Sequence, residues 1–298
     1  MRYITFTPKK QKDPRYGILK ENNEIIEISN TPDMPQDLVK FIAAGEETWD
    51  NAIYFANNDK YTYILDEVKL HSPLLRPPSL RDFYAFEEHV ATANANRARE
   101  VPKVWYQIPV FYFSNPYATL GHGDPISMPS YTQELDYELE VACIIGKAGM
   151  DIKPEEAEDY IFGYTIFNDW SARDEQRKEM SVGLGPAKGK DFASSFGPTI
   201  ITADELADKH TGRPGIFDLE MTAKINDKEY SRGNWKTLHY SFGEMIARAS
   251  DNVMLSPGDI IGSGTVGTGC LLELTKNQGP WLAKGDQVTL EIERLGSL

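Results

Sequence analysis

The sequence predicts a protein of mixed α and β structure in which strands predominate, with a small N-terminal domain before a larger one. Short stretches typical of strands recur along the 298 residues, whereas helical spacing is confined to a few segments. Three prolines in HSPLLRPPSLRDF, residues 71–83, stiffen an extended connector. We therefore expect a β-rich N-terminal domain at 1–75 and a main domain at 76–298.

The N-terminal region combines short strands with one helix. RYITF, YGILK and EIIEI, all within residues 1–28, alternate in the manner of strands, and ENN supplies turn residues between the last two. QDLVKFIAAG at 36–45 has helical spacing and ends at a glycine, which commonly stops a helix.

The main domain is expected to be built mainly from strands joined by long loops. Its two best helices are predicted to begin at SARD, capped by Ser171, and at FGEMIARA, capped by the preceding Ser241. A serine at this position accepts a hydrogen bond from the first turn. Long loops in a compact domain commonly carry function. The expected strands are VFYFSN, ELDYELEVACIIG, YIFGYTIFN, GPTIIT, LEMTAKIN, DIIGSG, CLLELT and QVTLEIERL.

Composition and charge exclude several classes of function. Apolar residues make up 41% and charged residues 26%, which is typical of a globular protein. A net charge of −14 argues against nucleic acid or an anionic membrane as partner, because no basic stripe is available for phosphates. Cys143 and Cys270 are the only cysteines, so the sequence offers neither a disulfide framework nor a thiolate metal site. With no signal peptide or membrane span in the sequence, we expect a cytoplasmic protein.

One glycine motif is better explained by structure than by ligand binding. GSGTVG at 262–267 satisfies the GxGxxG pattern of dinucleotide sites, but that pattern requires a helix to follow it. Here the chain continues as TGCLLELT, which predicts a strand. We therefore interpret the glycines as a tight loop between strands.

The stretch ELDYELEVACIIG at 134–146 raises an electrostatic question. Its strict alternation predicts a half-buried strand in which Asp136, Glu138 and Glu140 share one face. Carboxylates at i and i+2 lie roughly 6.6 Å apart and repel by roughly 2.5 kcal/mol at an effective dielectric of about 20. Either this face is solvated, or a divalent cation holds the acids together.

Two further acids and one histidine favour the cation. Asp169 ends the apolar strand YIFGYTIFN, and Asp82 follows the proline connector. His89 comes seven residues after Asp82 on a helix-compatible segment, which makes it a candidate base near a metal. The remaining histidines lack such acidic surroundings and are expected on the surface or in packing roles; they are His71, His122, His210 and His239.

Several motifs, in order, resemble the fumarylacetoacetate hydrolase family. They are RDFYAFEEH, WYQIPVFY, LDYELEVA, NDWSARDEQ, GKDF, GSGT and LLEL, which span roughly residues 78–295. The spacing from Asp82 to His89 is similar to that in fumarylacetoacetases. The resemblance implies a β-roll or β-sandwich catalytic domain, a divalent ion (Mg²⁺ or Ca²⁺, with Mn²⁺ also suitable), a homodimer, and cleavage or rearrangement next to a ketone in small oxo acids.

The resemblance also implies roles for individual residues. Asp136 either lies next to the metal ligands without binding the ion, or faces solvent. The arginine that follows the histidine in the family matches either Arg97 or Arg99. The implied metal ligands are Asp82, Glu138, Glu140 and Asp169; the implied catalytic residues are His89, Glu273 and Lys190; the implied substrate contacts are Tyr112, Arg173, Gln176 and Thr265.

These residues suit the hydrolysis of a carbon–carbon bond in a 1,3-diketo acid such as fumarylacetoacetate, giving fumarate and acetoacetate. The barrier lies in the negative charge that builds on an enolate oxygen, which a divalent ion and Lys190 stabilise. A histidine oriented by a carboxylate activates water near neutral pH. We therefore expect Glu273 to orient His89, and His89 to deprotonate the water.

Some positions depart from the fumarylacetoacetase pattern and leave alternatives open. The N-terminal region is shorter, and Met180 stands where a tyrosine is expected. The resemblance implies that decarboxylases and acylpyruvases of the family carry a glutamate three residues after the histidine. This chain has Thr92 at that position. The alternatives are oxaloacetate decarboxylation, acylpyruvate hydrolysis or oxo-acid isomerisation on the same scaffold, and a non-catalytic metal-binding β protein.

Overall fold

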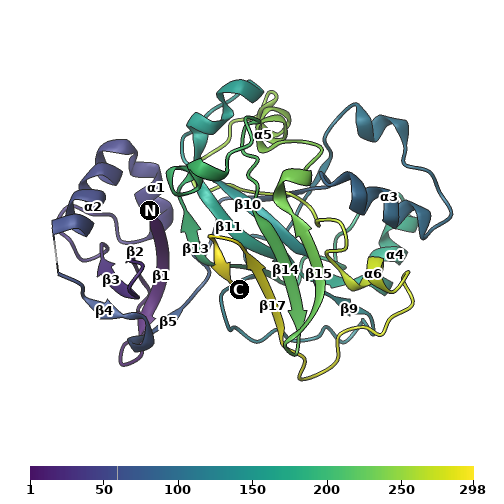
Figure 1. Ribbon diagram of the computed structural model, residues 1–298, viewed down its shortest axis with the longest axis horizontal. Coiled ribbons are helices and arrows are strands. Elements are labelled where there is room, and N and C mark those ends of the chain that lie inside the picture. The colour runs from purple at the N-terminus through teal and green to yellow at the C-terminus, as the bar shows by residue number, and fades with distance from the viewer. Residues whose placement is uncertain (59) are drawn as a thin grey trace.

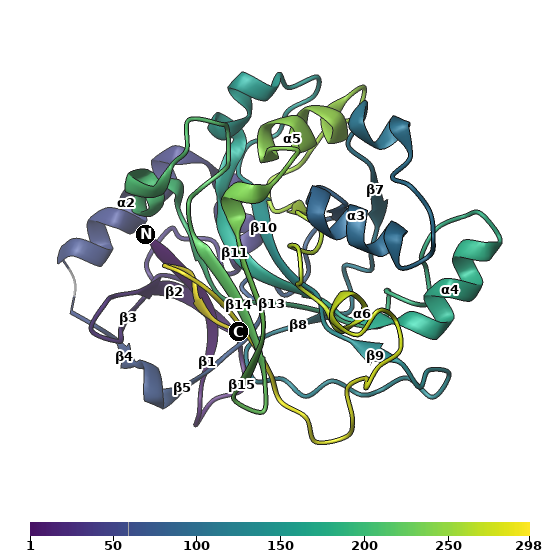
Figure 2. The same cartoon turned by 45° about the vertical axis from the view of Figure 1, so that its right-hand side comes forward.

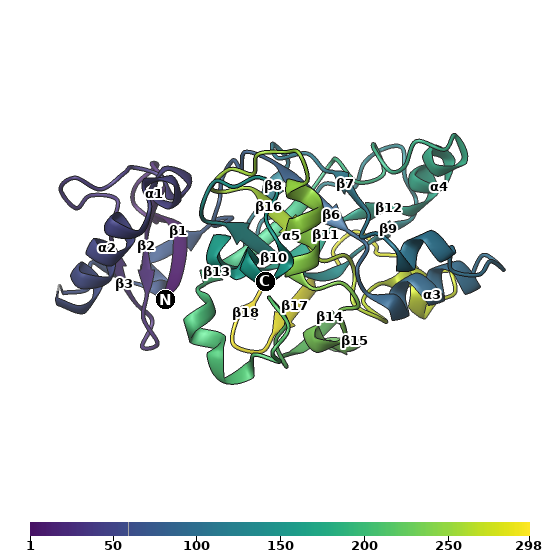
Figure 3. The ribbon, with the colours of Figure 1, turned by 90° about the horizontal axis from the view of Figure 1, so that it is seen from above.

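The computed structural model describes residues 1–58 and 60–298 and confirms a mixed α and β fold with large sheets (Figure 1). The N-terminal strands and helices lie at one end of the molecule, and α3 and α4 lie at the other (Figure 3). Within the described residues, no helix combines the length and the apolar character needed to cross a membrane.

The N-terminal part contains the predicted strands and helix, and a second helix that the sequence analysis missed. That helix, α2, spans Glu46–Asn58 and packs toward the core through Ala52 and Ala56, one turn apart. The elements of this part are β1 (Arg2–Pro8), β2 (Arg15–Leu19), β3 (Glu24–Glu27), α1 (Leu38–Ala44), α2, β4 (Tyr63–Ile64), a 3₁₀ turn (Leu65–Glu67) and β5 (Val68–Leu70).

The main part is built on strands, with short helices between them. Its elements are β6 (Leu80–Phe83), α3 (Glu87–Ala95), β7 (Phe111–Phe113), β8 (Thr119–Leu120), β9 (Leu135–Asp136), β10 (Leu139–Ile145), β11 (Ile161–Asp169), β12 (Ser171–Ala172), α4 (Arg173–Ser181), β13 (Ser194–Ile201), β14 (Glu220–Ile225), β15 (Lys228–Asn234), α5 (Phe242–Ser250), β16 (Ile260–Gly262), α6 (Leu271–Leu274), β17 (Val288–Ile292) and β18 (Gly296–Ser297). Short 3₁₀ helices lie at Lys103–Tyr106, Pro154–Tyr160, Ala203–Lys209 and Trp235–Thr237.

A 12-stranded sheet runs through both parts of the chain. Its strand order is β4-β3-β2-β1-β13-β11-β10-β16-β6-β7, with β5 and β8 pairing off this path. The N-terminal strands join the main part where β1 pairs with β13, Tyr3 lying opposite Ile200. Because this sheet contains strands from both sides of residue 75, it does not test the domain boundary expected there, which stays a prediction.

A second, four-stranded sheet, β15-β14-β17-β18, lies beside the middle of the large sheet (Figure 2). The two share a core with α5, in which Tyr164 of β11 lies against Trp235 and Phe217. These rings are fully buried, and aromatic pairs at such distances stabilise a core beyond the area they bury. The core fixes the central strands that end at the site described below.

Three local predictions need correction and one is confirmed. CLLELT forms the short helix α6 instead of a strand. Ser171 does not cap α4; its hydroxyl donates to the Asp169 carbonyl, and Ala172 occupies the cap position. The stretch 134–146 forms two strands, β9 and β10, that belong to different sheets. Ser241 does cap α5 in the expected reciprocal arrangement with Glu244.

Candidate active site and metal centre

Four buried carboxylates meet near the ends of β11, β10 and β6, which with β16 are neighbours in the large sheet. In the register of β10 with β11, Leu139 pairs with Asn168, so the residues just beyond that pair, Glu138 and Asp169, face each other. Asp82 comes from β6, which β16 separates from β10. One oxygen from each of Asp82, Glu138, Glu140 and Asp169 lies within 4.8 Å of the others. The structure thus brings together all the residues expected as metal ligands.

The glycine loop after β16 makes room for this cluster. Gly262 pairs with Asp82, and a Cβ at Gly262 would lie 2.5 Å from Asp82 Oδ1, too close for any side chain. Gly264 has φ +77° and donates its N–H to Asp82 Oδ1 at 3.2 Å. The hydroxyl of Thr265 lies 3.3 Å from Glu140 Oε1. The GSGT motif therefore shapes the acidic cluster.

Lysine, arginine and tyrosine side chains offset part of the negative charge. The Lys190 ammonium donates to both Glu138 and Asp169. Arg173 Nη2 lies 2.8 Å from Glu138 Oε1. The Tyr112 hydroxyl donates to Asp169 and, at 3.1 Å, to Asp82. Lys190 thus lies at the carboxylates, where the resemblance placed it, and Tyr112, expected as a substrate contact, also lies at the carboxylates.

The ionisation of the cluster reflects burial and repulsion. Burial raises the pKa of Asp82 to about 8, and the charge of Asp169 adds to this effect. Burial and the charges of Asp82 and Glu138 hold the pKa of Glu140 well above its usual value. Burial also raises the pKa of Asp169 to about 6 although Lys190 opposes the shift. For Glu138, burial is outweighed by Lys190 and Arg173, which lower its pKa.

The cluster has the composition of a site for a hard divalent cation. Among the described residues, Glu140 Oε2 and Asp169 Oδ1 are buried oxygens with no hydrogen-bond partner. Buried carboxylate oxygens normally have a partner, and Mg²⁺, Mn²⁺ and Ca²⁺ bind oxygen ligands of this kind. The residues present therefore fit such an ion.

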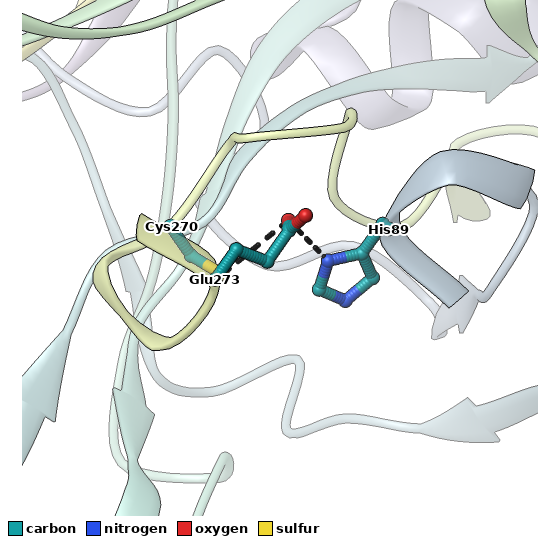
Figure 4. A group of neighbouring side chains, drawn as sticks. All are labelled: His89, Cys270 and Glu273. Carbon is teal, nitrogen blue, oxygen red and sulfur yellow. Dashed lines mark hydrogen bonds and ion pairs between the residues drawn. The ribbon is translucent and has the colours of Figure 1, made fainter. Parts of the chain in front are cut away.

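A histidine–glutamate pair forms the second element of the site (Figure 4). His89 lies on α3, and its Nδ1 is 2.5 Å from Glu273 Oε1 on α6. The second Glu273 oxygen accepts the N–H of Thr268 at 3.1 Å, which fixes the carboxylate. His89 Nε2 lies on the side of the ring turned away from Glu273. The pairing predicted from distant parts of the sequence is present.

Asp136, whose place the sequence left open, is fully buried and ties the two elements together. It accepts the N–H groups of Leu271 and Leu272 at the start of α6, at 2.8 and 3.0 Å. It also accepts Nε of Arg173 at 2.8 Å. The interpretation in which the acids of 134–146 face solvent is therefore wrong, because Asp136, Glu138 and Glu140 are all buried. Arg173, expected to contact substrate, is held between Asp136 and Glu138.

A cavity of about 520 Å³ lies over both elements. Gln176 lines it and accepts Nη1 of Arg173 at 3.1 Å. Sequence analysis missed Tyr84, which lines the cavity and contacts the His89 ring edge to face. The sequence feature that could have identified it is its position two residues after Asp82. Lining residues named in the sequence analysis are Asp82, His89, Arg97, Arg99, Tyr112, Glu138, Glu140, Arg173, Gln176, Met180, Lys190 and Thr265.

Comparison with known proteins identifies the family. Residues 79–298 match the family described as fumarylacetoacetate (FAA) hydrolase C-terminal. The chain belongs to the fumarylacetoacetate hydrolase family. The match covers the whole site, and three of the four clustered acids, the lysine and the histidine line one cavity, whereas Asp169 and Glu273 lie behind its lining. The protein therefore belongs among enzymes.

Similar proteins carry the names of tautomerases, isomerases and hydrolases. The chain is 28% identical to oxaloacetate tautomerase fahd2, mitochondrial, of Xenopus laevis, over 100% of this chain and 89% of that protein. It is 29% identical to oxaloacetate tautomerase YisK of Bacillus subtilis, over 89% and 86%. A fumarylacetoacetate hydrolase from Exiguobacterium antarcticum has a similar structure, with TM-score 0.76 and 26% identity over 100% of this chain and 97% of that chain.

Proposed function

We propose that this family member is a divalent-metal-dependent enzyme that interconverts the enol and keto forms of a small oxo dicarboxylic acid, with oxaloacetate as the substrate. The observation that carries the proposal is the His89–Glu273 pair beside a cluster of carboxylates in one cavity. The names of the frog and Bacillus relatives favour this reaction over the hydrolysis that the sequence analysis put first.

Tautomerisation requires one proton to leave carbon and one to reach oxygen. In the keto form, the C3–H bond of oxaloacetate is weakened by the neighbouring carbonyl groups, and its breaking leaves an enolate. His89 takes the C3 proton on Nε2, while the Glu273 carboxylate stabilises the imidazolium through Nδ1. The imidazolium then gives its Nε2 proton to the enolate oxygen, which completes the enol and restores neutral His89, and ketonisation runs the same steps in reverse. No water attacks, no CO₂ is lost, and no carbon–carbon bond breaks.

The carboxylate cluster provides the charge that the enolate requires. Asp82, Glu138, Glu140 and Asp169 would hold a divalent ion, with Mg²⁺ as our choice and Mn²⁺ or Ca²⁺ also suitable. When bound, the ion supplies positive charge that stabilises the developing enolate oxygen. Lys190 stays protonated because, although burial opposes its charge, Asp169 and Glu138 raise its pKa. Its ammonium orients both carboxylates.

Arginines on the cavity wall favour a substrate with carboxylates. Arg97 and Arg99 both line the cavity. Burial lowers the pKa of Arg97, and the positive charges of Arg173 and Arg99 add to this effect. Guanidinium groups held near one another are stabilised when a carboxylate binds between them. A dicarboxylic oxo acid supplies one carboxylate for these cations while its reacting oxygen faces the acidic cluster.

The test follows enol oxaloacetate by ultraviolet absorbance while mass spectrometry identifies the products. We expect Mg²⁺-dependent acceleration of enol loss, with oxaloacetate intact and neither pyruvate nor smaller fragments formed. Arg97→Ala and Arg99→Ala are expected to raise KM about tenfold or more, whereas Arg294→Ala, which removes a surface ion pair with Asp208, leaves it unchanged. Enol loss at the uncatalysed rate with saturating Mg²⁺ would exclude the proposal.

Hydrolysis of a diketo acid remains the second candidate. Pairing of His89 with a distant glutamate is the arrangement that the resemblance associates with water activation, and the Exiguobacterium neighbour is named a hydrolase. The same mass spectrometric assay, with fumarylacetoacetate and acylpyruvates as substrates, distinguishes the two reactions by the presence of fragments. The homodimer and the cytoplasmic location stay predictions.

A further inference from the structure

A second group of metal-ligating side chains lies behind the catalytic histidine. Cys270 Sγ is 3.7 Å from Glu273 Oε1, the same oxygen that contacts His89 Nδ1 at 2.5 Å. Figure 4 shows the Glu273 carboxylate between the thiol and the imidazole. Nitrogen, sulfur and oxygen atoms of these residues all lie within 4.8 Å of one another, and all three side chains are buried.

We infer that His89, Cys270 and Glu273 form a binding site for a thiophilic divalent ion such as Zn²⁺, and that its occupation inhibits the enzyme. This site is distinct from the oxygen cluster, since its donors are one imidazole, one thiolate and one carboxylate, a set that favours Zn²⁺ over Mg²⁺. The cysteine count alone had excluded a thiolate site; the fold supplies the other two ligands. The inhibition, but not the binding, rests on the proposed function.

The distances suit tetrahedral zinc after one small movement. With usual zinc–ligand bond lengths, sulfur and oxygen ligands on one ion lie about 3.6 Å apart, close to the Sγ–Oε1 distance present. Nitrogen and oxygen ligands lie about 3.4 Å apart. The His89–Glu273 contact therefore opens by roughly 0.9 Å when an ion replaces the shared proton.

The carboxylates near Cys270 disfavour a free thiolate there and attract a cation. Burial and the carboxylates of Asp136 and Glu273 hold the pKa of Cys270 well above its usual value, against the opposing charge of Arg173. Without an ion the thiol therefore stays protonated. The same carboxylates attract a dication, which releases the thiol proton by direct coordination.

Coordination removes the catalytic base. The ion takes the Nδ1 lone pair, so the imidazole proton moves from Nδ1 to Nε2, and the thiol proton leaves to water. His89 Nε2 then carries a hydrogen and cannot accept one from substrate. One proton is released for each ion bound, and Glu273 no longer supports the imidazolium.

The test uses Co²⁺ as a spectroscopic probe in the full chain with Mg²⁺ in large excess, so that the oxygen cluster is filled. We expect thiolate-to-cobalt charge-transfer absorption in the wild type and in Cys143→Ala, which removes the other cysteine, and none in Cys270→Ser or Cys270→Ala. Cobalt binding without this absorption in the wild type, or absorption that persists without Cys270, overturns the site.

Two further measurements address folding and inhibition. Release of one proton per Zn²⁺ in weakly buffered solution tests the site on the wild type alone, and no release counts against it. The Zn²⁺ concentration that halves each protein's own rate is expected to rise at least about tenfold in Cys270→Ser and to stay unchanged in Cys143→Ala. Equal inhibition of wild type and Cys270→Ser refutes the inhibitory role. Because the cobalt assay needs no turnover, it stands independently of the proposed tautomerase activity.

Discussion

Replacing Glu273 with glutamine should separate the charge of the catalytic pair from its geometry. Glutamine has nearly the same shape and keeps one oxygen that can accept the N–H of His89 Nδ1. It removes the negative charge that lies 2.5 Å from that nitrogen. When His89 takes a proton, unit charges about 4 Å apart gain about 4 kcal/mol at an effective dielectric of 20. The variant loses most of this stabilisation in the transition state.

The expected loss in rate follows from that energy. Each 1.36 kcal/mol corresponds to about tenfold, so 4 kcal/mol sets an upper limit of roughly a thousandfold. The amide dipole keeps part of the interaction, and we therefore expect kcat to fall roughly 10²- to 10³-fold, with KM nearly unchanged. The assay is Mg²⁺-dependent loss of enol oxaloacetate under saturating substrate.

A matched control lies on the same helix as the histidine. Glu88→Gln makes the same chemical change at an exposed position next to His89, and it should leave kcat within about twofold. If Glu273→Gln retains a third or more of the wild-type rate, the carboxylate does not support a charged imidazolium, and the assignment of His89 as base is refuted.

Three further outcomes follow from the structure. In metal-free protein, the pKa values of Asp82 and Asp169 are raised to about 8 and about 6, so the folded state binds more protons than the unfolded state. The free energy of unfolding should therefore decrease as pH rises through roughly 4 to 8. Thermal unfolding in EDTA measures this dependence, and a stability that rises over this range would contradict it. With Mg²⁺ at a hundred times its Kd, the free energy of unfolding of the wild type should rise by about 2.7 kcal/mol, with a higher Tm. Glu140→Gln should lose most of this gain, because it removes a ligand oxygen with no other partner among the described residues. An equal gain in both proteins argues against the site. Ser241→Ala should lower the free energy of unfolding by about 1 kcal/mol through loss of the helix cap, with kcat unchanged, as denaturant titration and rate assays can check.

The sequence carried enough information to predict the acids but not their environment. The strand expected around Glu140 is present as β10, whereas Glu138 lies in the break between β9 and β10. The end of the next strand correctly placed Asp169. Alternation cannot distinguish a face that contacts water from one buried under loops and helices, because both show the same period. The groups that contact these acids include Tyr112, Lys190 and the 262–267 loop, which come from other parts of the chain.

The error at CLLELT has a similar cause. Its leucines and cysteine suit a strand, and a helix of four residues is too short for a periodic signal. The segment becomes helical because the Asp136 carboxylate accepts two N–H groups of its first turn. Such a cap comes from 135 residues away in the chain, so no local pattern reports it. The helical turn also aims Glu273 at His89, which a strand in the same place would not do.

Asp136 explains why the chain tolerates acids at three alternate positions. The chain leaves the strand pattern between β9 and β10, so Asp136 does not lie with Glu138 and Glu140. Its charge is neutralised by Arg173 and by the start of α6, and Arg173 in turn contacts Glu138. One buried network therefore sets both the carboxylate that would hold the metal and the helix that carries Glu273. The His89–Glu273 pair and the carboxylate cluster keep their relative positions because the same arginine and aspartate contact both.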